Sequence, residues 1–371
     1  MKKYIVLILI SLLVFSCSSN LAADSFVTAK AAILMDAETG QVLYRKNIHQ
    51  LRAPASTTKI MTGLLAIENG NLTDQVTVSM RAAQEGGSSI YLAEGEELSL
   101  KELIYGLLVK SGNDAAIAVA QHIGGSVENF ARMMNLKAKQ LGAGNTNFKN
   151  PNGLPQKGHL STAYDLAQIA RYALEDDFFA KVVSTPKKRI SWPDHNWDRI
   201  LNNTNKLLTK SDFVDGVKTG YTRAAGRCLV ASASKGDRKL ISVVLASNQL
   251  WQDSLNLLNH GFDRFEKKQL IKKGSVVDQV ELGGSRIDLK AAENFSKVMS
   301  KEEKSNLKRK IEYKSKVRLP VVKGEKLGEL VFYNQSDQVI KRVSLLADKR
   351  VDLAPGNQFW QKVITKIQIY F

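Results

Sequence analysis

Ser56-Thr-Thr-Lys59 stands at the head of an apolar segment whose residues recur at helical spacing up to Ile67. A serine and a lysine three residues apart share one face of a helix. The serine hydroxyl is a weak nucleophile until a base takes its proton, and an uncharged lysine can do so. The alternative, without a catalytic role, is a helix-capping serine beside a solvated lysine. The stretch therefore predicts a helix that begins at Ser56 and carries a candidate nucleophile and base.

A second string, Ser111-Gly-Asn113, lies between two apolar helical segments. A tight connection on a rigid scaffold is a good place for positioned polar groups. Ser111 is then a candidate proton relay and Asn113 a candidate ligand of a substrate amide. A helix C-cap at Gly112 followed by a new N-cap explains the same residues without any function.

A third string, Lys218-Thr-Gly220, precedes a predicted strand and is typical of the start of an edge strand beside a cleft. Lys218 would supply a second cation, which helps to keep Lys59 uncharged. Thr219 is a candidate ligand of a carboxylate, and Gly220 would let a substrate backbone lie against the strand. The alternative is an exposed edge lysine that discourages aggregation.

The predicted elements follow one another as a strand pair, a block of helices, a second strand pair and a last helix. This order indicates an α+β fold, an antiparallel sheet flanked by helices. The expected strands are 26–35, 41–44, 227–234 and 239–247, and the expected helices are 101–109, 115–123, 126–141, 162–174 and 253–266. From residue 267 the chain becomes lysine-rich, with short β-like runs at 276–282, 316–322 and 329–333. We therefore predict a catalytic domain over residues 24–266 and a smaller all-β domain over 267–355.

The N-terminus resembles a signal peptide over residues 1–23, with two lysines before an apolar run from Tyr4 to Phe15. That run is too short to span a bilayer. Two cleavage readings stay open: a lipoprotein box ending at Cys17, which would be lipidated, and ordinary cleavage after Ala22 or Ala23. Either reading predicts export to the outer face of the cytoplasmic membrane, in a periplasm or cell-wall space.

The formal net charge of +17 points to an acidic polymer, anionic lipid or nucleic acid as partner. No zinc-finger, Rossmann or P-loop pattern is present, so we expect no nucleic acid. The tail, residues 356–371, has apolar and aromatic residues at helical spacing with lysines between them, which predicts an amphipathic helix on a membrane surface. A final helix packed on the β domain is the alternative.

Five ordered stretches together resemble the serine D-alanyl-D-alanine carboxypeptidases, which are low-molecular-mass penicillin-binding proteins: 55–62, 111–116, 150–154, 161–167 and 215–220. The resemblance runs from about Phe26 to Phe265 and more weakly to the C-terminus. It implies a β-lactamase/transpeptidase-like fold and a peptidoglycan stem peptide ending in D-Ala-D-Ala as substrate. It also implies covalent inhibition by β-lactam antibiotics, and it implies neither a metal nor another cofactor.

Site roles follow from the resemblance, residue by residue. Ser56 would be the acylated nucleophile and Lys59 its base, with Ser111 and Asn113 lining the cleft. The substrate-binding set would be Lys218, Thr219, Gly220 and Tyr221. The first two of these would hold the terminal carboxylate of the substrate, and the backbone N–H groups of Ser56 and Tyr221 would form the oxyanion hole.

One position departs from the family pattern. Members often carry an arginine near the start of the helix after the last sheet strand, and this chain has Trp251 in that region. Arg223 or Arg227 would then have to replace it as a ligand of the substrate carboxylate.

Three rival functions make different demands on the sequence. A class A β-lactamase needs a glutamate on a loop between the second and third motifs, and residues 147–154 contain no acid. A Ser-His-Asp hydrolase needs a histidine in a triad, and the five histidines show no such pattern; His159 reads as structural. A catalytically weak wall-binding scaffold would bind penicillin without turning over a D-Ala-D-Ala peptide.

Overall fold

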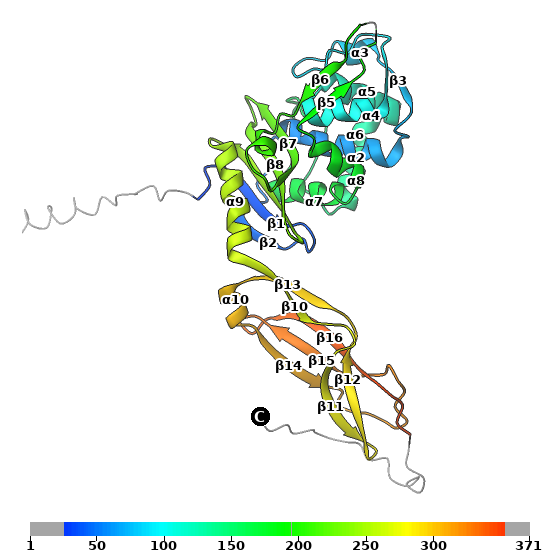
Figure 1. Cartoon of the computed structure of the whole chain (residues 1–371), viewed down its shortest axis with the longest axis vertical. Coiled ribbons are helices and arrows are strands. Elements are labelled where there is room, and N and C mark those ends of the chain that lie inside the picture. The colour runs from blue at the N-terminus through cyan, green and yellow to red at the C-terminus, as the bar shows by residue number, and fades with distance from the viewer. Residues whose placement is uncertain (1–25, 194, 353–371) are drawn as a thin grey trace, which may run out of the picture. The chain divides into compact units, whose positions relative to one another are not determined.

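The computed structural model describes residues 26–193 and 195–352 (Figure 1). The predicted signal peptide, with Cys17, and the predicted tail helix therefore lie outside the described residues. Internal contacts divide the chain into two compact units, 1–33 with 45–231 and 242–257, and 34–44 with 232–241 and 258–371. The predicted domain boundary after residue 266 stays a prediction.

A five-stranded antiparallel sheet has the order β2-β1-β9-β8-β7, which confirms the predicted α+β fold. Its strands are β1 (Ala31–Asp36), β2 (Val42–Lys46), β7 (Val214–Thr222), β8 (Gly226–Lys235) and β9 (Arg238–Ser247). All of β1 and the middle of β8 and β9 are buried, and continuous burial means that both faces are covered. Because β7 has only β8 as a neighbour, Lys218 and Thr219 lie on an edge strand, as predicted.

Helices cover the two faces of this sheet. Helix α9 (Leu250–Arg264) packs so closely that a side chain at Gly261 would meet Leu34 and Leu240. Figure 1 shows the helices that lie between β2 and β7 in the chain gathered in one block. They are α2 (Lys59–Asn69), α3 (Met80–Ala83), α4 (Leu100–Tyr105), α5 (Asn113–Gly124), α6 (Val127–Gln140), α7 (Ala163–Ala173) and α8 (Asp177–Val183).

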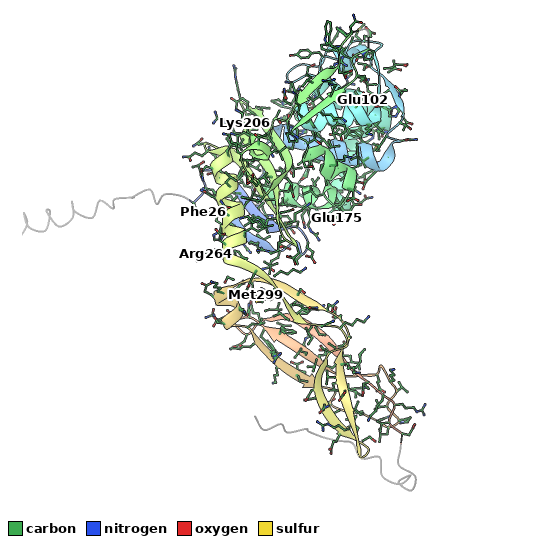
Figure 2. The ribbon with its side chains drawn as sticks, in the orientation of Figure 1. Phe26, Glu102, Glu175, Lys206, Arg264 and Met299 are labelled. Carbon is green, nitrogen blue, oxygen red and sulfur yellow. The ribbon has the colours of Figure 1, made fainter. Side chains whose placement is uncertain are left out.

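Side chains set where several of these helices begin. Ser126 and Thr162 accept hydrogen bonds from the backbone of α6 and α7, and such caps contribute about 1 kcal/mol each. Ser99 and Glu102 form a reciprocal capping box at α4. Glu102, labelled in Figure 2, also accepts a 2.6 Å hydrogen bond from Ser191, so it joins α4 to a distant loop.

Two helix predictions need correction at their ends. The predicted helix 101–109 is α4 followed by a π-helical turn, η2 (Gly106–Lys110), which stops at Ser111 in a left-handed conformation. The predicted helix start at Ser56 is a 3-10 turn, η1 (Ala55–Thr58), and α2 begins only at Lys59. Ser56 is therefore not a helix cap but part of a tighter turn before the helix.

Short elements that the sequence did not predict lie between the helices: the pairs β3 (Gln75–Thr77) with β4 (Glu97–Ser99) and β5 (Lys187–Ile190) with β6 (Arg199–Asn202), and η3 (Lys206–Thr209). Arg199 and Glu96 fix the second pair through a buried, two-pronged ion pair. This pair of strands leads directly to Thr204, which is part of the site described below.

The C-terminal part forms a separate all-β core. Strands β11 (Val276–Leu282), β12 (Ser285–Ala291), β16 (Val339–Ala347), β15 (Lys326–Tyr333) and β14 (Lys308–Tyr313) make a sheet in that order. Beside it stand the pair β10 (Phe265–Ile271) and β13 (Phe295–Ser300) and the short α10 (Lys301–Ser305). Alternate residues of β12, such as Ile287 and Leu289, enter the core.

The predicted β-like run 276–282 is β11, and 329–333 forms the end of β15. The predicted run 316–322 is wrong, because apart from an isolated bridge at Val321 it forms no ladder. Pro320 lies within it and has no backbone N–H to donate to a neighbouring strand.

Within residues 26–193 and 195–352, no helix is long and apolar enough to cross a membrane. In the same residues Cys228, on β8, is a buried free thiol, and burial raises its pKa to about 11.

Candidate active site

The turn η1 presents Ser56, and its backbone is held in an uncommon conformation. Ala55 has a φ of +49°, which is rare for a residue with a side chain. Two glycines allow the surrounding chain to approach: a Cβ at Gly153 would lie 1.9 Å from the carbonyl oxygen of Ala55, and one at Gly220 would lie 2.9 Å from the nitrogen of Ser56. The turn that carries Ser56 is therefore clamped between β7 and the loop that contains Gly153.

This placement gives a different reason why residue 220 must be glycine. Its missing side chain faces the turn that carries Ser56, so glycine is needed for the approach of β7 to η1. The sequence interpretation had assigned that space to the substrate backbone.

Lys59 lies at the start of α2 and is completely buried. Its Nζ donates to Ser56 Oγ at 3.2 Å, to Asn113 Oδ1 at 2.7 Å and to the carbonyl oxygen of Asn152 at 2.7 Å. Burial lowers the pKa of Lys59 well below its ordinary value, and the charge of Lys218 lowers it further. Three donated bonds belong to the charged amine. Once uncharged, the amine keeps two N–H bonds, which suit Asn113 and Asn152, and its lone pair can accept the proton of Ser56 Oγ.

Asn113, the first residue of α5, bridges two segments. It accepts from Lys59 and donates through Nδ2 to the carbonyl oxygen of Gly86 at 2.6 Å. The neighbouring Asp114 is a buried carboxylate that accepts from the backbone N–H groups of Ile90 and Leu92. The start of α5 therefore organises the loop over residues 86–92 around the site.

Ser111 is buried at the end of η2, with a φ of +72°. Ser111 itself is the C-cap of η2 and Gly112 is the N-cap of α5, so each cap lies one residue earlier than the structural reading of this string expected. No hydrogen bond joins the Ser111 hydroxyl to Ser56 or to either lysine among the described residues. A role for Ser111 as proton relay stays a prediction.

Lys218 and Thr219 both contact Thr204, a residue that the sequence analysis did not identify. Lys218 is buried, and its Nζ donates to the carbonyl oxygen of Thr219 at 3.2 Å and lies 3.5 Å from Thr204 Oγ1. Thr219 Oγ1 donates to the same Thr204 hydroxyl at 2.7 Å. Burial lowers the pKa of Lys218 to about 7.

Tyr221 follows on β7, and its side chain is exposed. It lines a pocket of about 580 Å³ with Gly220, Arg227 and Trp251, while the lining does not include Arg223. Arg227 donates to the carbonyl oxygen of Asn248 at 3.4 Å. Lys218 and Thr219 do not line this pocket, so a role of Arg227 or Arg223 as ligand of the substrate carboxylate stays a prediction.

The site also contains residues that sequence reasoning missed. Asn152 was quoted within the 150–154 stretch without a role, yet its carbonyl oxygen is a direct partner of Lys59. Its side chain donates to Glu85 at 2.8 Å, and Glu85 in turn makes no hydrogen bond to Ser56 or Lys59 among the described residues. The sequence around Glu85 and Thr204 contains no motif that indicates a role, because only tertiary contacts bring these residues to the site. Residues 26–193 and 195–352 contain no group of His, Cys, Asp and Glu fit to hold a metal ion.

Comparison with known proteins gives two family matches. Residues 18–249 match the model of the D-alanyl-D-alanine carboxypeptidase family, and residues 265–353 match the C-terminal domain of penicillin-binding protein 5. The chain is 40% identical to the D-alanyl-D-alanine carboxypeptidase DacF of Bacillus subtilis, covering 82% of this chain and 81% of that protein. It is 35% identical to DacD of Escherichia coli, covering 91% and 93%.

Solved structures agree with these relatives. DacD from Francisella tularensis matches with a TM-score of 0.74 at 29% identity, over 92% of this chain and 100% of that one. Penicillin-binding protein 5 from Haemophilus influenzae matches with a TM-score of 0.72 at 30% identity, over 88% and 98%. The site has a buried lysine that donates to a serine on a strained turn. The family match and the curated relatives show that this chain belongs to the D-alanyl-D-alanine carboxypeptidase family of penicillin-binding proteins.

Proposed function

We propose that this protein removes the terminal D-alanine of peptidoglycan stem peptides through an acyl-enzyme on Ser56, and that penicillin acylates the same serine. The observation that carries the proposal is the 3.2 Å contact between Lys59 Nζ and Ser56 Oγ in a buried site. Burial lowers the pKa of Lys59 well below its ordinary value, so this lysine loses its proton more readily than a solvated lysine and is better suited to act as a base.

In the proposed acylation, Lys59 takes the proton of Ser56, and Oγ attacks the carbonyl carbon of the penultimate D-alanine. Backbone N–H groups of Ser56 and Tyr221 stabilise the oxyanion. The C–N bond between the two D-alanines then breaks, and the leaving amine receives a proton, for which Ser111 is the proposed relay. Water hydrolyses the resulting Ser56 ester and regenerates the enzyme.

The terminal carboxylate of the substrate is assigned to Lys218 and Thr219. The two side chains converge on Thr204, so a carboxylate there meets an amine and hydroxyl groups together. A bound carboxylate favours the charged form of Lys218, which burial alone disfavours. The substrate itself would therefore help to charge the residue that binds it.

Mass spectrometry after exposure to penicillin tests the nucleophile. We expect one adduct, on the peptide that contains Ser56, because a strained lactam mimics the D-Ala-D-Ala bond. An adduct on another serine would contradict the assignment. Adduct formation without turnover of a D-Ala-D-Ala peptide would favour the wall-binding scaffold, and rapid loss of the adduct as hydrolysed penicillin would favour a β-lactamase.

We also propose an exported protein that the tail, residues 356–371, holds at the membrane surface. The support is its sequence: aromatic and aliphatic residues at helical spacing with Lys362 and Lys366 between them. Attraction to anionic lipid adds about 1 kcal/mol per lysine near the surface. The β-rich second domain would then act as a spacer between membrane and catalytic domain.

Removal of the tail should abolish binding to vesicles that contain anionic lipid, with no loss of peptide cleavage. The test compares the full chain with one ending at Ala354, both lacking Cys17 so that lipidation plays no part. Sedimentation with the vesicles measures binding. Equal sedimentation of the two proteins would mean that the tail is not the anchor and would favour a helix packed on the β domain.

A further inference from the structure

His159 is a buried histidine that the reaction described above does not use. It is 3% exposed and packs against the ring of Phe148. Its Nδ1 accepts from the backbone N–H of Lys149 at 3.0 Å, and its Nε2 lies 2.9 Å from Thr58 Oγ1. Thr58 is itself fully buried, two residues after the nucleophile, and its hydroxyl donates to the carbonyl oxygen of Ala55 at 2.8 Å.

The two ends of this chain of hydrogen bonds determine where every proton lies. The N–H of Lys149 can only donate, so His159 Nδ1 must be the acceptor nitrogen of a neutral imidazole. Nε2 then carries the ring proton and donates to Thr58, because the threonine uses its own proton on Ala55. A second ring proton would break the bond to Lys149, and burial likewise opposes the charge: the pKa of His159 is lowered to about 4.

The chain ends on the peptide bond that joins Ala55 to Ser56. In a planar trans peptide, the carbonyl oxygen and the following N–H point in opposite directions, so whatever orients one orients the other. The oxygen belongs to Ala55, whose φ of +49° persists only where neighbours hold it. The N–H belongs to Ser56 and is the group assigned above to the oxyanion.

We propose that His159, acting through Thr58, holds the Ala55–Ser56 peptide plane in the orientation that aims the Ser56 N–H at the oxyanion. His159 is thus a positioning residue for transition-state stabilisation, which acts through Thr58. The inference rests on the proposed function, since it concerns the oxyanion hole of the same site. It predicts a defect specific to tetrahedral species, whereas a purely structural histidine predicts only lower stability.

A matched pair of variants at Thr58 separates the effect of the hydroxyl group from the effect of the side-chain shape. Thr58→Val keeps the branched shape but leaves Ala55 and His159 without their partner, and Thr58→Ser keeps the hydroxyl but loses a methyl group. We expect kcat of Thr58→Val to fall by about 10- to 100-fold with little change in KM, because a displaced oxyanion donor acts on the transition state. Thr58→Ser should recover most of that loss.

The decisive readout is affinity for a peptide boronic acid, whose tetrahedral adduct places an oxygen where the oxyanion forms. Its inhibition constant should rise in Thr58→Val by the same factor as kcat falls. Phe130→Leu, in the core of α6, is the control: it should lower the melting temperature without changing boronate affinity. Boronate affinity and kcat at wild-type levels in folded Thr58→Val would overturn the proposal.

If Thr58→Val does not fold, a pair at His159 decides instead. His159→Gln can place an amide donor near the position of Nε2, and His159→Leu cannot. Boronate affinity at least about tenfold higher in the glutamine variant supports the proposal, and equal affinity overturns it. Failure of the proposed function looks different: wild-type protein would then show neither a Ser56 adduct nor boronate inhibition.

Discussion

Ser56→Ala and Lys59→Arg should each lower kcat for a D-Ala-D-Ala peptide by about 10⁴-fold or more, because nucleophile and base act as one unit. Arginine keeps its positive charge at any working pH and cannot accept the serine proton. The double variant should be no worse than either single variant. Steady-state kinetics, together with penicillin labelling of Ser56, measure all three proteins.

Lys59 donates to three acceptors in a fully buried site, so arginine there can disturb folding. Lys59→Met is the control, since it keeps an unbranched side chain and removes the amine. It should fold, as circular dichroism can verify, and be as inactive as Lys59→Arg. Substantial turnover by folded Lys59→Met would eliminate Lys59 as the base. In the wild type, kcat/KM should rise with pH as Lys59 loses its proton, below the free lysine value of about 10.4.

Lys218→Met should have two opposite effects: loss of activity by about 100-fold or more, and a gain in stability. The folded-state pKa of Lys218 is lowered to about 7, whereas the unfolded chain has a value near 10.4. Between these values the unfolded state binds more protons, so the stability of the wild type rises with pH. Burial of a lysine that holds its proton less readily costs the wild type folding free energy at low pH, and the methionine variant does not have this cost. Its advantage should therefore be largest below pH 7, on the order of 4 kcal/mol, and vanish near pH 10.4.

Denaturant unfolding at pH 6, 8 and 10 measures this difference. Lys206→Met is the matched control, because Lys206 on η3 is exposed and its replacement should leave the unfolding free energy unchanged at each pH (Figure 2). A Lys218→Met protein whose stability advantage is absent, or is the same at pH 6 and pH 10, would show that the lysine is not held against a burial penalty.

Local sequence could predict the parts of this molecule that depend on local patterns. The strands β8 and β9 and helix α6 follow from periodicity and from capping residues such as Ser126. The prediction of a β-like run at 316–322 failed because Pro320, which has no backbone N–H to donate to a ladder, lies within it. The pair β5–β6 was missed because its strands are short and a buried ion pair to Glu96 holds them.

The residues of the site likewise fall into those that local motifs could predict and those that depend on tertiary contacts. Ser56, Lys59, Asn113 and Lys218 were found from ordered motifs, and the structure brings Ser56, Lys59 and Asn113 into direct contact. Glu85, Thr204 and the acceptor role of Asn152 arise from contacts between segments far apart in sequence, so no local pattern could indicate them. Gly220 was identified correctly as special, but which backbone it accommodates became clear only when η1 and β7 lay side by side.

The buried thiol of Cys228 has a consequence for how the protein reacts with oxidants and disulfides. With a pKa of about 11, almost none of it is thiolate at neutral pH, and the thiolate is the species that attacks disulfides or oxidants. The folded protein therefore presents no reactive sulfur from β8, while an unfolded chain does. Reaction of Cys228 with a thiol reagent would report how completely each molecule has folded, and in the proposed exported protein, burial of the thiol on folding would protect it from mispairing with other chains.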